Sequence, residues 1–383
     1  MAEQLPLRGR RIVEVLATSA GGVGTHVRSL VPVVRAAGAT VGVCGAPATE
    51  ELFGFTRAGA DFRPIGISAG LAPAADSRAV LQLRRALDGA DLVHAHGLRA
   101  GLVAALARRI SGARSAPLVL TLHNAILEDA GPLQRVLRAA ERTTIRGADL
   151  VLAVSSDLAA NARRAGARDV RVLPAVAPPR PPATRSRAEV REELGVDEGR
   201  PLVVAIGRLH PQKGYDVLLE AVARWEVDDR LGTPPLVAIA GDGPLEAELA
   251  DRIRASRLPV LLLGRRDDVA DLLGAAELCV LPSRWEGSPF TAQEALRAGT
   301  PLVSTRAGGL PELLGDGAAL VPVGDAGALA DAVVRVLTDP AHAAELVERG
   351  RRQASTWPDE EGAARRLVAV YRELLGAPGT GLP

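Results

Sequence analysis

Short apolar runs alternate with amphipathic stretches along most of this 383-residue chain, and this alternation limits its fold more than any other feature. Runs of three to five residues separated by helical segments are typical of parallel sheets that are covered by helices. The sequence therefore predicts an α/β fold with two successive doubly wound, Rossmann-like domains. The predicted strands lie at residues 12–16, 41–43, 92–95, 118–122, 150–154, 170–173, 202–206, 236–240, 260–262, 278–281 and 301–304.

A proline-rich segment separates the two series of runs. Residues 174–182 contain five prolines, a composition that excludes a helix and is typical of a stiff linker. We therefore expect an N-terminal domain at residues 1–178 and a C-terminal domain at 179–356. The following helix, residues 357–375, is expected to cross back and brace the first domain, and residues 376–383 are expected to form a tail.

Composition excludes several classes of protein. A net charge of +1 and an aromatic content of 2% argue against a nucleic-acid partner, because a phosphate backbone needs basic residues and bases need stacking platforms. Cys44 and Cys279 lie in apolar runs of different halves, which indicates reduced thiols in a cytoplasmic protein. No signal-peptide pattern or run of eighteen apolar residues occurs. We expect a cytoplasmic protein, with peripheral contact at the inner face of the plasma membrane left open.

Lys213 is the only lysine among 46 lysines and arginines. It follows the run 202–206 and the pair Gly207-Arg208, and it lies just before a predicted helix. A lysine offers a compact point charge, whereas arginine offers a planar fork. Two cations beside the amides of a helix N-terminus suit a diphosphate. The alternative is a surface lysine that merely escaped a bias toward arginine.

Two glutamates lie eight residues apart after the run 278–281. Glu286 is expected in a loop and Glu294 on a helix that begins near Pro289. The amides of Phe290 and Thr291 would be free at that helix entrance and could bind an anion. Spacing alone favours ordinary glutamates at a helix start and on a solvated helix face.

A glycine-rich loop, Gly21-Gly22-Val-Gly24, follows the first predicted strand and opens a helix. Glycines there let the backbone approach a ligand closely. A dinucleotide fingerprint is excluded, because a third glycine is missing at the required spacing and the strand near residues 41–45 lacks a ribose-binding acid after it. A simple strand-to-helix turn is the remaining alternative.

His94 and His96 lie two residues apart at a strand end and should share one face of the sheet, where His26 and His123 could join them. No carboxylate or cysteine clusters with them in the sequence, so we expect no zinc ion there. Thr121 and Asn124 lie at the end of the next strand, where both could meet a ligand.

The motifs of the second half, taken in order, resemble those of the retaining glycosyltransferases of family 4. The resemblance covers essentially the whole chain and implies the two-domain GT-B fold, with two Rossmann-like domains facing across a cleft. It also implies sugar transfer from a nucleotide-diphosphate donor, with no cofactor and no metal. The matching motifs are Gly207-Arg208 with Lys213-Gly214, Gly241-x-Gly243-Pro244, Gly264 with Asp268, Pro282-Ser283, Glu286-x7-Glu294 and Gly308-Gly309-x-Pro311-Glu312.

The resemblance also implies roles for individual residues. Arg208 and Lys213 would hold the donor diphosphate, Glu286 would lie beside the donor sugar, and Glu294 would bind the ribose hydroxyls. His96 would act in catalysis near the reacting sugar. Further donor-binding residues would be Gly22, Arg265, Ser288, Phe290 and Thr291, and acceptor-binding residues would be Gly24, Thr121 and Asn124.

Several questions stay open at this stage. Many family members have Phe-Gly after the Glu-Gly pair, whereas this chain has Ser288-Pro289, and because proline offers no amide N–H there, the identity of the donor sugar stays open. The expected donor is a UDP- or GDP-sugar. The acceptor could be a glycan, a lipid-linked precursor of the cell envelope or a small molecule. Retention could follow from attack on the face that the diphosphate leaves, or from Glu286 acting as a covalent nucleophile. A hydrolysing sugar-nucleotide epimerase and a noncatalytic binding protein are the alternative functions.

A stripe of arginines follows one face of the helix predicted around residues 132–146. Arg135, Arg138, Arg142 and Arg146 recur every three or four residues, which could serve an anionic lipid or a phosphorylated acceptor. A solvated helix face is the interpretation that we favour.

Overall fold

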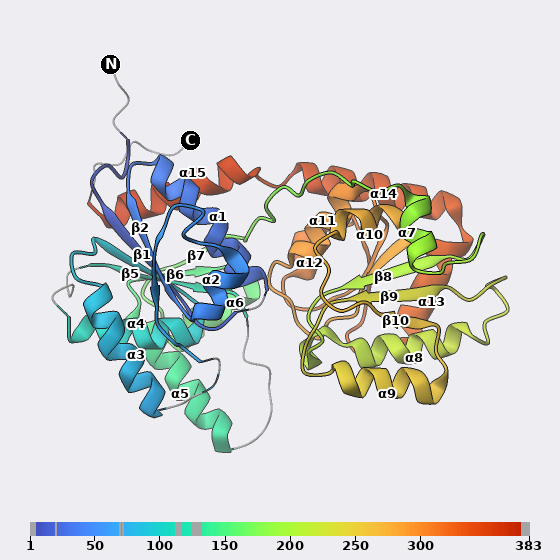
Figure 1. The fold of residues 1–383 in the computed structure, drawn as a ribbon, viewed down its shortest axis with the longest axis horizontal. Helices are drawn as coiled ribbons and strands as arrows, with labels where there is room; N and C mark the ends of the chain where they lie inside the picture. The colour runs from blue at the N-terminus through green and yellow to red at the C-terminus, as the bar shows by residue number, and fades with distance from the viewer. Residues whose placement is uncertain are drawn as a thin grey trace. The chain divides into compact units, whose positions relative to one another are not determined.

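The structure is a computed structural model in which residues 5–19, 21–68, 70, 73–111, 116–124 and 132–376 are described, apart from the side chains of 73, 132–136 and 360. The chain divides into two compact units (Figure 1). Unit 1 comprises Met1–Pro178 with Pro358–Pro383, and unit 2 comprises Pro179–Trp357. The boundary between them falls within the proline-rich segment.

Unit 1 is built on a seven-stranded parallel sheet with the strand order β3-β2-β1-β4-β5-β6-β7. Its helices lie on both faces of that sheet (Figure 1). The strands are β1 (Arg11–Leu16), β2 (Thr40–Gly45), β3 (Asp61–Pro64), β4 (Leu92–His96), β5 (Leu118–Leu122), β6 (Leu150–Ala153) and β7 (Val170–Val172). The helices are α1 (Gly22–Ala36), α2 (Pro47–Phe53), α3 (Pro73–Ala86), α4 (Leu98–Arg109), α5 (Pro132–Gly147), α6 (Ser156–Ala165) and α15 (Glu360–Leu374).

Unit 2 repeats this design with a six-stranded parallel sheet in the order β10-β9-β8-β11-β12-β13. Its strands are β8 (Leu202–Ile206), β9 (Leu236–Ala240), β10 (Val260–Leu262), β11 (Leu278–Leu281), β12 (Leu302–Thr305) and β13 (Ala319–Val321). Its helices are α7 (Arg187–Glu193), α8 (Tyr215–Trp225), α9 (Glu246–Ser256), α10 (Val269–Ala275), α11 (Phe290–Ala298), α12 (Leu310–Leu314), α13 (Ala326–Thr338) and α14 (Pro340–Ser355).

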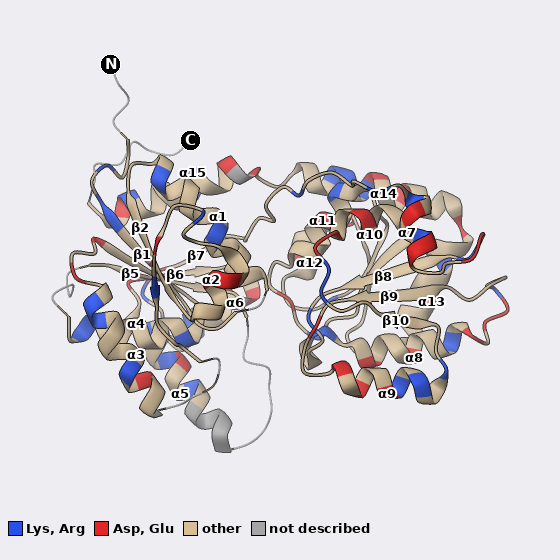
Figure 2. Ribbon diagram, in the orientation of Figure 1, with Lys and Arg blue, Asp and Glu red and all other residues tan. Residues whose placement is uncertain are grey.

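The predicted α/β class with two parallel sheets is confirmed. The central strands β1, β4, β5, β8 and β11 are almost wholly buried, as continuous apolar runs require. Each unit therefore has its own core. Charged residues concentrate on the covering helices and the loops (Figure 2).

The last helix, α15, belongs to unit 1 although the whole of unit 2 precedes it in the chain. Leu367 and Tyr371 of α15 are buried in the same apolar cluster as Ile12 of β1 and Val31 of α1. The core of unit 1 is therefore completed by the C-terminal end of the chain.

Two surface features bear on membrane contact. Within the described residues, no helix is long and apolar enough to cross a membrane. On α5, the side chains of Arg138, Arg142 and Arg146 are exposed, while that of Arg135 lies outside the described residues. The Arg146 guanidinium donates to the carbonyl oxygen of Ala165 over 3.1 Å, so one end of this stripe is engaged within unit 1.

Candidate active-site clusters

Lys213 lies in a tight turn between β8 and α8, and its ammonium contacts Glu286. The short 3-10 helix η1 (Pro211–Lys213) ends at Gly214, whose backbone is left-handed with φ 67°. A Cβ on Gly214 would lie 2.1 Å from the carbonyl oxygen of Pro282, so only glycine lets the two backbone segments come this close. Lys213 Nζ lies 2.6 Å from Glu286 Oε1. The turn thus presents the ammonium to the carboxylate.

Glu286 is buried in the loop between β11 and α11, and both its backbone and its side chain are engaged. Ser283 Oγ donates to Glu286 Oε1 over 2.6 Å, and the Gly309 amide donates to the Glu286 carbonyl over 2.8 Å. A Cβ on Gly308 would lie 2.2 Å from that carbonyl oxygen. We name Lys213, Ser283 and Glu286 the lysine cluster. An anion that entered it would compete with Glu286 for the ammonium.

Glu294 lies on α11, as predicted, but its partner is a residue that the sequence did not single out. Its side chain is 8% exposed, and Arg180 Nε donates to Glu294 Oε1 over 2.7 Å. At the start of the helix, Thr291 Oγ1 donates to the carbonyl oxygen of Ile206 over 3.3 Å, which ties α11 to the end of β8. Ser288 Oγ accepts from Gln293 Nε2 over 3.1 Å. Phe290, the first residue of α11, is half-buried.

The two expected arginines of the donor site are less constrained than Lys213. Arg208 directly follows the turn after β8 and is exposed, and its guanidinium makes no ion pair or hydrogen bond with the described part of the chain. Arg265 is also exposed, with its Nε 3.9 Å from Asp267 Oδ1. Both side chains are therefore accessible to an anion from solvent.

The glycine loop has a packing role that its sequence did not reveal. Gly22 opens α1 and is exposed, whereas Gly24 is buried. A Cβ on Gly24 would lie 2.1 Å from the ring of Phe53, so the glycine lets α1 pack against α2. Asn124, which follows β5, is exposed.

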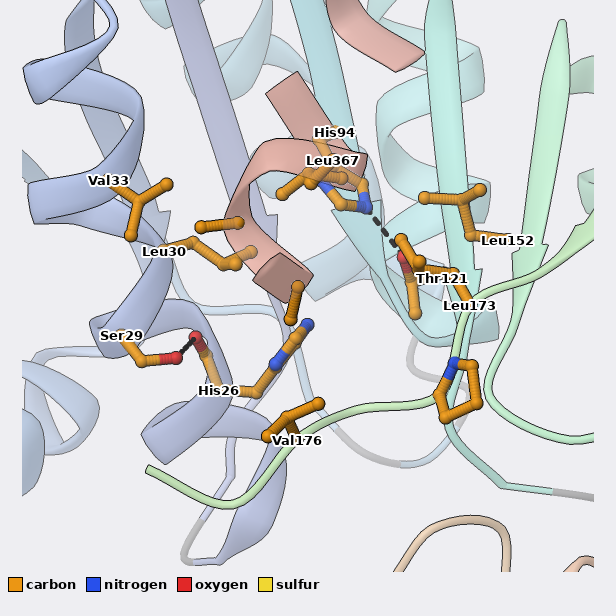
Figure 3. Close-up of a pocket in the computed structure, with 13 residues that line it drawn as sticks. His26, Ser29, Leu30, Val33, His94, Thr121, Leu152, Leu173, Val176 and Leu367 are labelled. Carbon is orange, nitrogen blue, oxygen red and sulfur yellow. Dashed lines mark hydrogen bonds between the residues drawn. The ribbon is translucent and has the colours of Figure 1, made fainter. Parts of the chain in front are cut away.

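Four histidines converge in unit 1, which confirms the expectation that His26 and His123 join His94 and His96. The ring centroids of His94 and His96 lie 4.1 Å apart. The His26 ring lies 5.8 Å from that of His96 and 5.4 Å from that of His123. We name these four residues the histidine cluster. His26 and His94 also line a small pocket, shown in Figure 3, with Thr121 beside His94 and Leu367 of α15 on one wall.

A carboxylate does cluster with these histidines, so the argument that none does is wrong. Glu14 lies in the middle of β1 and is fully buried. Its Oε2 is 2.8 Å from His96 Nε2 and 3.2 Å from His94 Nδ1. The Tyr371 hydroxyl donates to Glu14 Oε1 over 3.0 Å. Parallel pairing of β1 with β4 places Glu14 opposite His94, on the same face of the sheet as His96.

Burial sets the charge states in the histidine cluster. It lowers the pKa of His26 to about 3 and that of His96 to about 4, and it lowers the pKa of His123 well below the usual range. Burial alone would raise the pKa of Glu14, but the electrostatic interaction with His94 and hydrogen bonds from His94 and His96 hold that pKa well below its usual range. Near neutral pH, Glu14 is therefore ionised, and the rings of His26, His96 and His123 are neutral.

Two sets of these residues have ligand atoms within 4.8 Å of one another, namely His26 with His96 and His123, and Glu14 with His94 and His96. Imidazole and carboxylate are both zinc ligands. Hydrogen bonds already engage atoms of both sets, namely the ring nitrogens and carboxylate oxygens of the second and the contact of His96 Nδ1 with His123 Nε2 in the first.

Three residues were missed by the sequence reasoning. Glu14 carried a usable signal, because a charged residue in the middle of an apolar strand needs a buried partner. Tyr371 carried a weaker one, as one of only two tyrosines in the chain. Arg180 carried no such signal, because the proline-rich segment around it has no helix or strand pattern from which its partner could be predicted.

Comparison with known proteins identifies the family of this chain. The family model of the glycosyl transferases group 1 matches residues 186–353, and that of the glycosyl transferase 4-like domain matches residues 21–175. A 2-deoxystreptamine N-acetyl-D-glucosaminyltransferase of Streptomyces fradiae is 32% identical over 318 residues, which cover 76% of this chain and 73% of that protein. The chain belongs to the glycosyl transferases group 1 family. It is therefore a glycosyltransferase.

Two further similarities cover nearly all of this glycosyltransferase. An alpha-maltose-1-phosphate synthase of Mycolicibacterium smegmatis is 29% identical over 92% of this chain and 96% of its own length. The crystal structure of Anabaena HepE in complex with UDP-glucose has a TM-score of 0.78 at 22% identity, over 95% of this chain and 99% of that one. At this identity the structural similarity establishes the fold, and it confirms the predicted GT-B architecture.

Proposed function

We propose that this glycosyltransferase is a retaining enzyme that transfers a sugar from a nucleotide diphosphate to an acceptor hydroxyl without a metal ion. The observation that carries the proposal is the lysine cluster, in which the only lysine of the chain is held 2.6 Å from the buried Glu286. The exposed Arg208, just after β8, supplies a second positive charge on the same unit. Unit 2 would bind the donor, and unit 1 the acceptor.

Stabilisation of the leaving group is the central step. As the bond between the sugar C1 and the phosphate oxygen breaks, negative charge develops on the diphosphate. Lys213 and Arg208 meet that charge, with the amides of Phe290 and Thr291 at the start of α11 as further donors. Glu286 balances the ammonium before the donor binds and lies beside the sugar afterwards. Glu294 accepts from the ribose hydroxyls.

Retention follows if the acceptor oxygen attacks C1 from the face that the diphosphate leaves. The bond from C1 to the acceptor oxygen forms as the bond from C1 to the phosphate oxygen breaks, and the acceptor proton passes to the departing diphosphate. The contacts of Glu286 favour this route over a covalent one, because its Oε1 already accepts from Lys213 and Ser283. Those two hydrogen bonds lower the nucleophilicity of the carboxylate.

Two of the similar proteins indicate the chemistry of the donor and of the acceptor. HepE, which has the same fold, was crystallised with UDP and with UDP-glucose, and this favours a UDP-sugar over a GDP-sugar as the donor. The name of the Streptomyces fradiae relative gives 2-deoxystreptamine, a small hydroxylated molecule, as its acceptor. We propose a polyhydroxylated acceptor of that class or a lipid-linked glycan, bound near Gly24, Thr121 and Asn124.

A thermal-shift screen of nucleotide-sugars tests the proposal directly. A donor at one hundred times its dissociation constant stabilises the folded protein by about 2.7 kcal/mol, which raises Tm by several degrees. We expect one UDP-sugar to do so in the presence of EDTA, and Lys213→Ala to abolish the shift. Proton NMR of the product, formed with a panel of acceptors, should show the anomeric configuration of the donor. No shift with any nucleotide-sugar would overturn the proposal.

A further inference from the structure

Both oxygens of the Glu14 carboxylate have partners, and the contacts join three separate elements of unit 1. Oε1, on β1, accepts from the Tyr371 hydroxyl of α15 over 3.0 Å. Oε2 lies 2.8 Å from His96 Nε2 and 3.2 Å from His94 Nδ1, both on β4. All four side chains are buried. Because a buried carboxylate without partners would be strongly unfavourable, these contacts hold Glu14 in one orientation.

The carboxylate decides which nitrogen of His96 carries the proton. An ionised carboxylate can only accept hydrogen bonds, so His96 Nε2 must be the donor across the 2.8 Å contact. The ring is neutral near pH 7, so its other nitrogen, Nδ1, keeps a lone pair. That atom forms a 3.2 Å hydrogen bond with His123 Nε2, so its lone pair accepts from His123 Nε2–H on the side of the ring away from Glu14.

From these contacts we infer that Glu14 and Tyr371 are positioning residues that hold His96 in the Nε2–H tautomer, so that Nδ1 is a hydrogen-bond acceptor for His123 Nε2–H or, in its place, for a substrate hydroxyl. This inference rests on the proposed function only in the last clause, because the tautomer follows from the contacts within unit 1. The C-terminal helix thus takes part in setting the protonation of a residue on β4.

Tyr371 suits this role because it links Glu14 to the rest of the network. With one proton, its hydroxyl donates to Glu14, and its oxygen then accepts from His94 Nδ1 at 2.5 Å. His94 Nε2 is in turn 2.6 Å from Thr121 Oγ1. Linked hydrogen bonds in a buried site polarise one another and resist reorientation. The other titratable groups at His96 are the rings of His26 on α1 and His123 after β5.

The test reads the tautomer of His96 by NMR rather than by activity. In protein labelled with ¹⁵N-histidine, long-range proton–nitrogen correlations near pH 7 distinguish a protonated ring nitrogen from a bare one, and His96→Gln assigns the signals. We expect wild-type His96 to be protonated at Nε2. In Glu14→Gln, an amide NH₂ facing His96 would donate to Nε2, so the ring should change to the Nδ1–H tautomer. An unchanged tautomer in Glu14→Gln would overturn the inference.

Tyr371→Phe gives an independent arm that keeps the aromatic ring. Without the hydroxyl, Glu14 Oε1 loses its donor and the carboxylate can rotate away from His96 Nε2, so we expect a mixture of His96 tautomers and about a tenfold lower kcat, with the donor KM unchanged. Tyr215→Phe is the matched control: it removes the other buried tyrosine hydroxyl, which donates to the Gly207 carbonyl in unit 2 over 3.0 Å, and should leave the His96 spectrum unchanged. If Glu14→Gln fails to fold, the comparison of Tyr371→Phe with Tyr215→Phe tests the inference by itself.

Failure of the inference and failure of the proposed function give different results. A tautomer change in Glu14→Gln or Tyr371→Phe with undiminished kcat would overturn the positioning role, because His96 would then not act on the substrate. A wild-type protein with the expected tautomer, but with no transfer from any nucleotide-sugar, would overturn the proposed function and leave the tautomer assignment supported.

Discussion

At the scale of single residues, the only lysine of the chain, Lys213, lies at a position where its side chain is held by a contact. In a chain that uses arginine for almost every positive charge, the one ammonium lies against the buried carboxylate of Glu286. An arginine at this turn would present a longer side chain and a planar guanidinium in place of the single ammonium that contacts Glu286 at 2.6 Å. We therefore expect position 213 to require a lysine and not merely a positive charge.

Lys213→Ala should lower kcat strongly and should lower the stability of the folded protein much less. Loss of a cation that stabilises the developing charge costs about 3 kcal/mol in the transition state, or about a hundredfold in kcat. Lys213→Arg should not restore the rate. Turnover with saturating donor and thermal unfolding measure the two effects separately.

A double variant separates charge pairing from catalysis. Lys213→Ala leaves the buried Glu286 with Ser283 as its remaining side-chain partner, so some stability is lost as well. Adding Glu286→Gln should recover that stability without recovering turnover. Full activity in the single variant Lys213→Arg would contradict the first of these predictions, because any positive charge would then suffice at this position.

Arg180 provides a second prediction at this scale. Its Nε occupies one oxygen of Glu294 and so orients the carboxylate on α11. Because Arg180 is partly exposed, Arg180→Ala should cost little stability, but it should weaken binding of a nucleoside diphosphate about tenfold through the loss of one charged hydrogen bond. Calorimetric titration with UDP measures the change. Arg164→Ala, on α6 of unit 1, is the matched control, and equal binding in both variants would contradict the prediction.

At the scale of elements, the sequence predicted the central strands and missed two at the sheet edges. β3 (Asp61–Pro64) and β13 (Ala319–Val321) each end one sheet and pair with a single neighbour. The residues of β3 are mostly exposed, so its sequence carries no apolar run. Edge strands are defined by backbone pairing rather than by burial, and a hydrophobic pattern cannot reveal that. The strands that carry Glu14, His96 and the turn to Lys213 are central, which explains why these strands could be predicted from their apolar runs.

The turn that holds Lys213 can be tested with a pair of glycines. Gly214 and Gly195 have similar left-handed backbones, with φ 67° and 63°. A Cβ on Gly214 would lie 2.1 Å from the Pro282 carbonyl oxygen, whereas one on Gly195 meets nothing within 4 Å. Gly195→Ala should cost about 1 kcal/mol of stability for the backbone conformation alone. Gly214→Ala should cost more and should also lower kcat, because the turn moves Lys213. Equal effects on denaturant unfolding would contradict this reasoning.

At the scale of the whole molecule, two doubly wound units of similar design differ in what they bury. Unit 1 encloses Glu14 and the histidine cluster, and its core needs α15 from the far end of the chain. Unit 2 contains all three tryptophans, Trp225, Trp285 and Trp357. The contribution of α15 to the network around Glu14 could not be predicted from sequence, because Tyr371 lies 357 positions away from Glu14 and no local pattern connects them.

This distribution predicts that acid destabilises unit 1 before unit 2. The rings of His26, His96 and His123 have lowered pKa values when folded but would bind protons when unfolded. Stability is therefore retained above about pH 6.5 and lost as the pH falls from there toward about 4. At pH 5 the loss is about 2 kcal/mol for His96 alone. Glu14, whose pKa is also lowered, adds a loss only below its unfolded value of about 4.5.

Two optical signals distinguish the units in this experiment. Because tryptophan fluorescence reports on unit 2 alone, far-UV circular dichroism should show a first thermal transition that moves to lower temperature between about pH 7 and pH 5, without a matching fluorescence change. His123→Gln removes one of the three rings and should reduce that pH dependence, whereas His342→Gln, at a partly exposed position of α14, should leave it unaltered. Coincident transitions at every pH would show that the units unfold together, and the acid sensitivity would then belong to the whole chain.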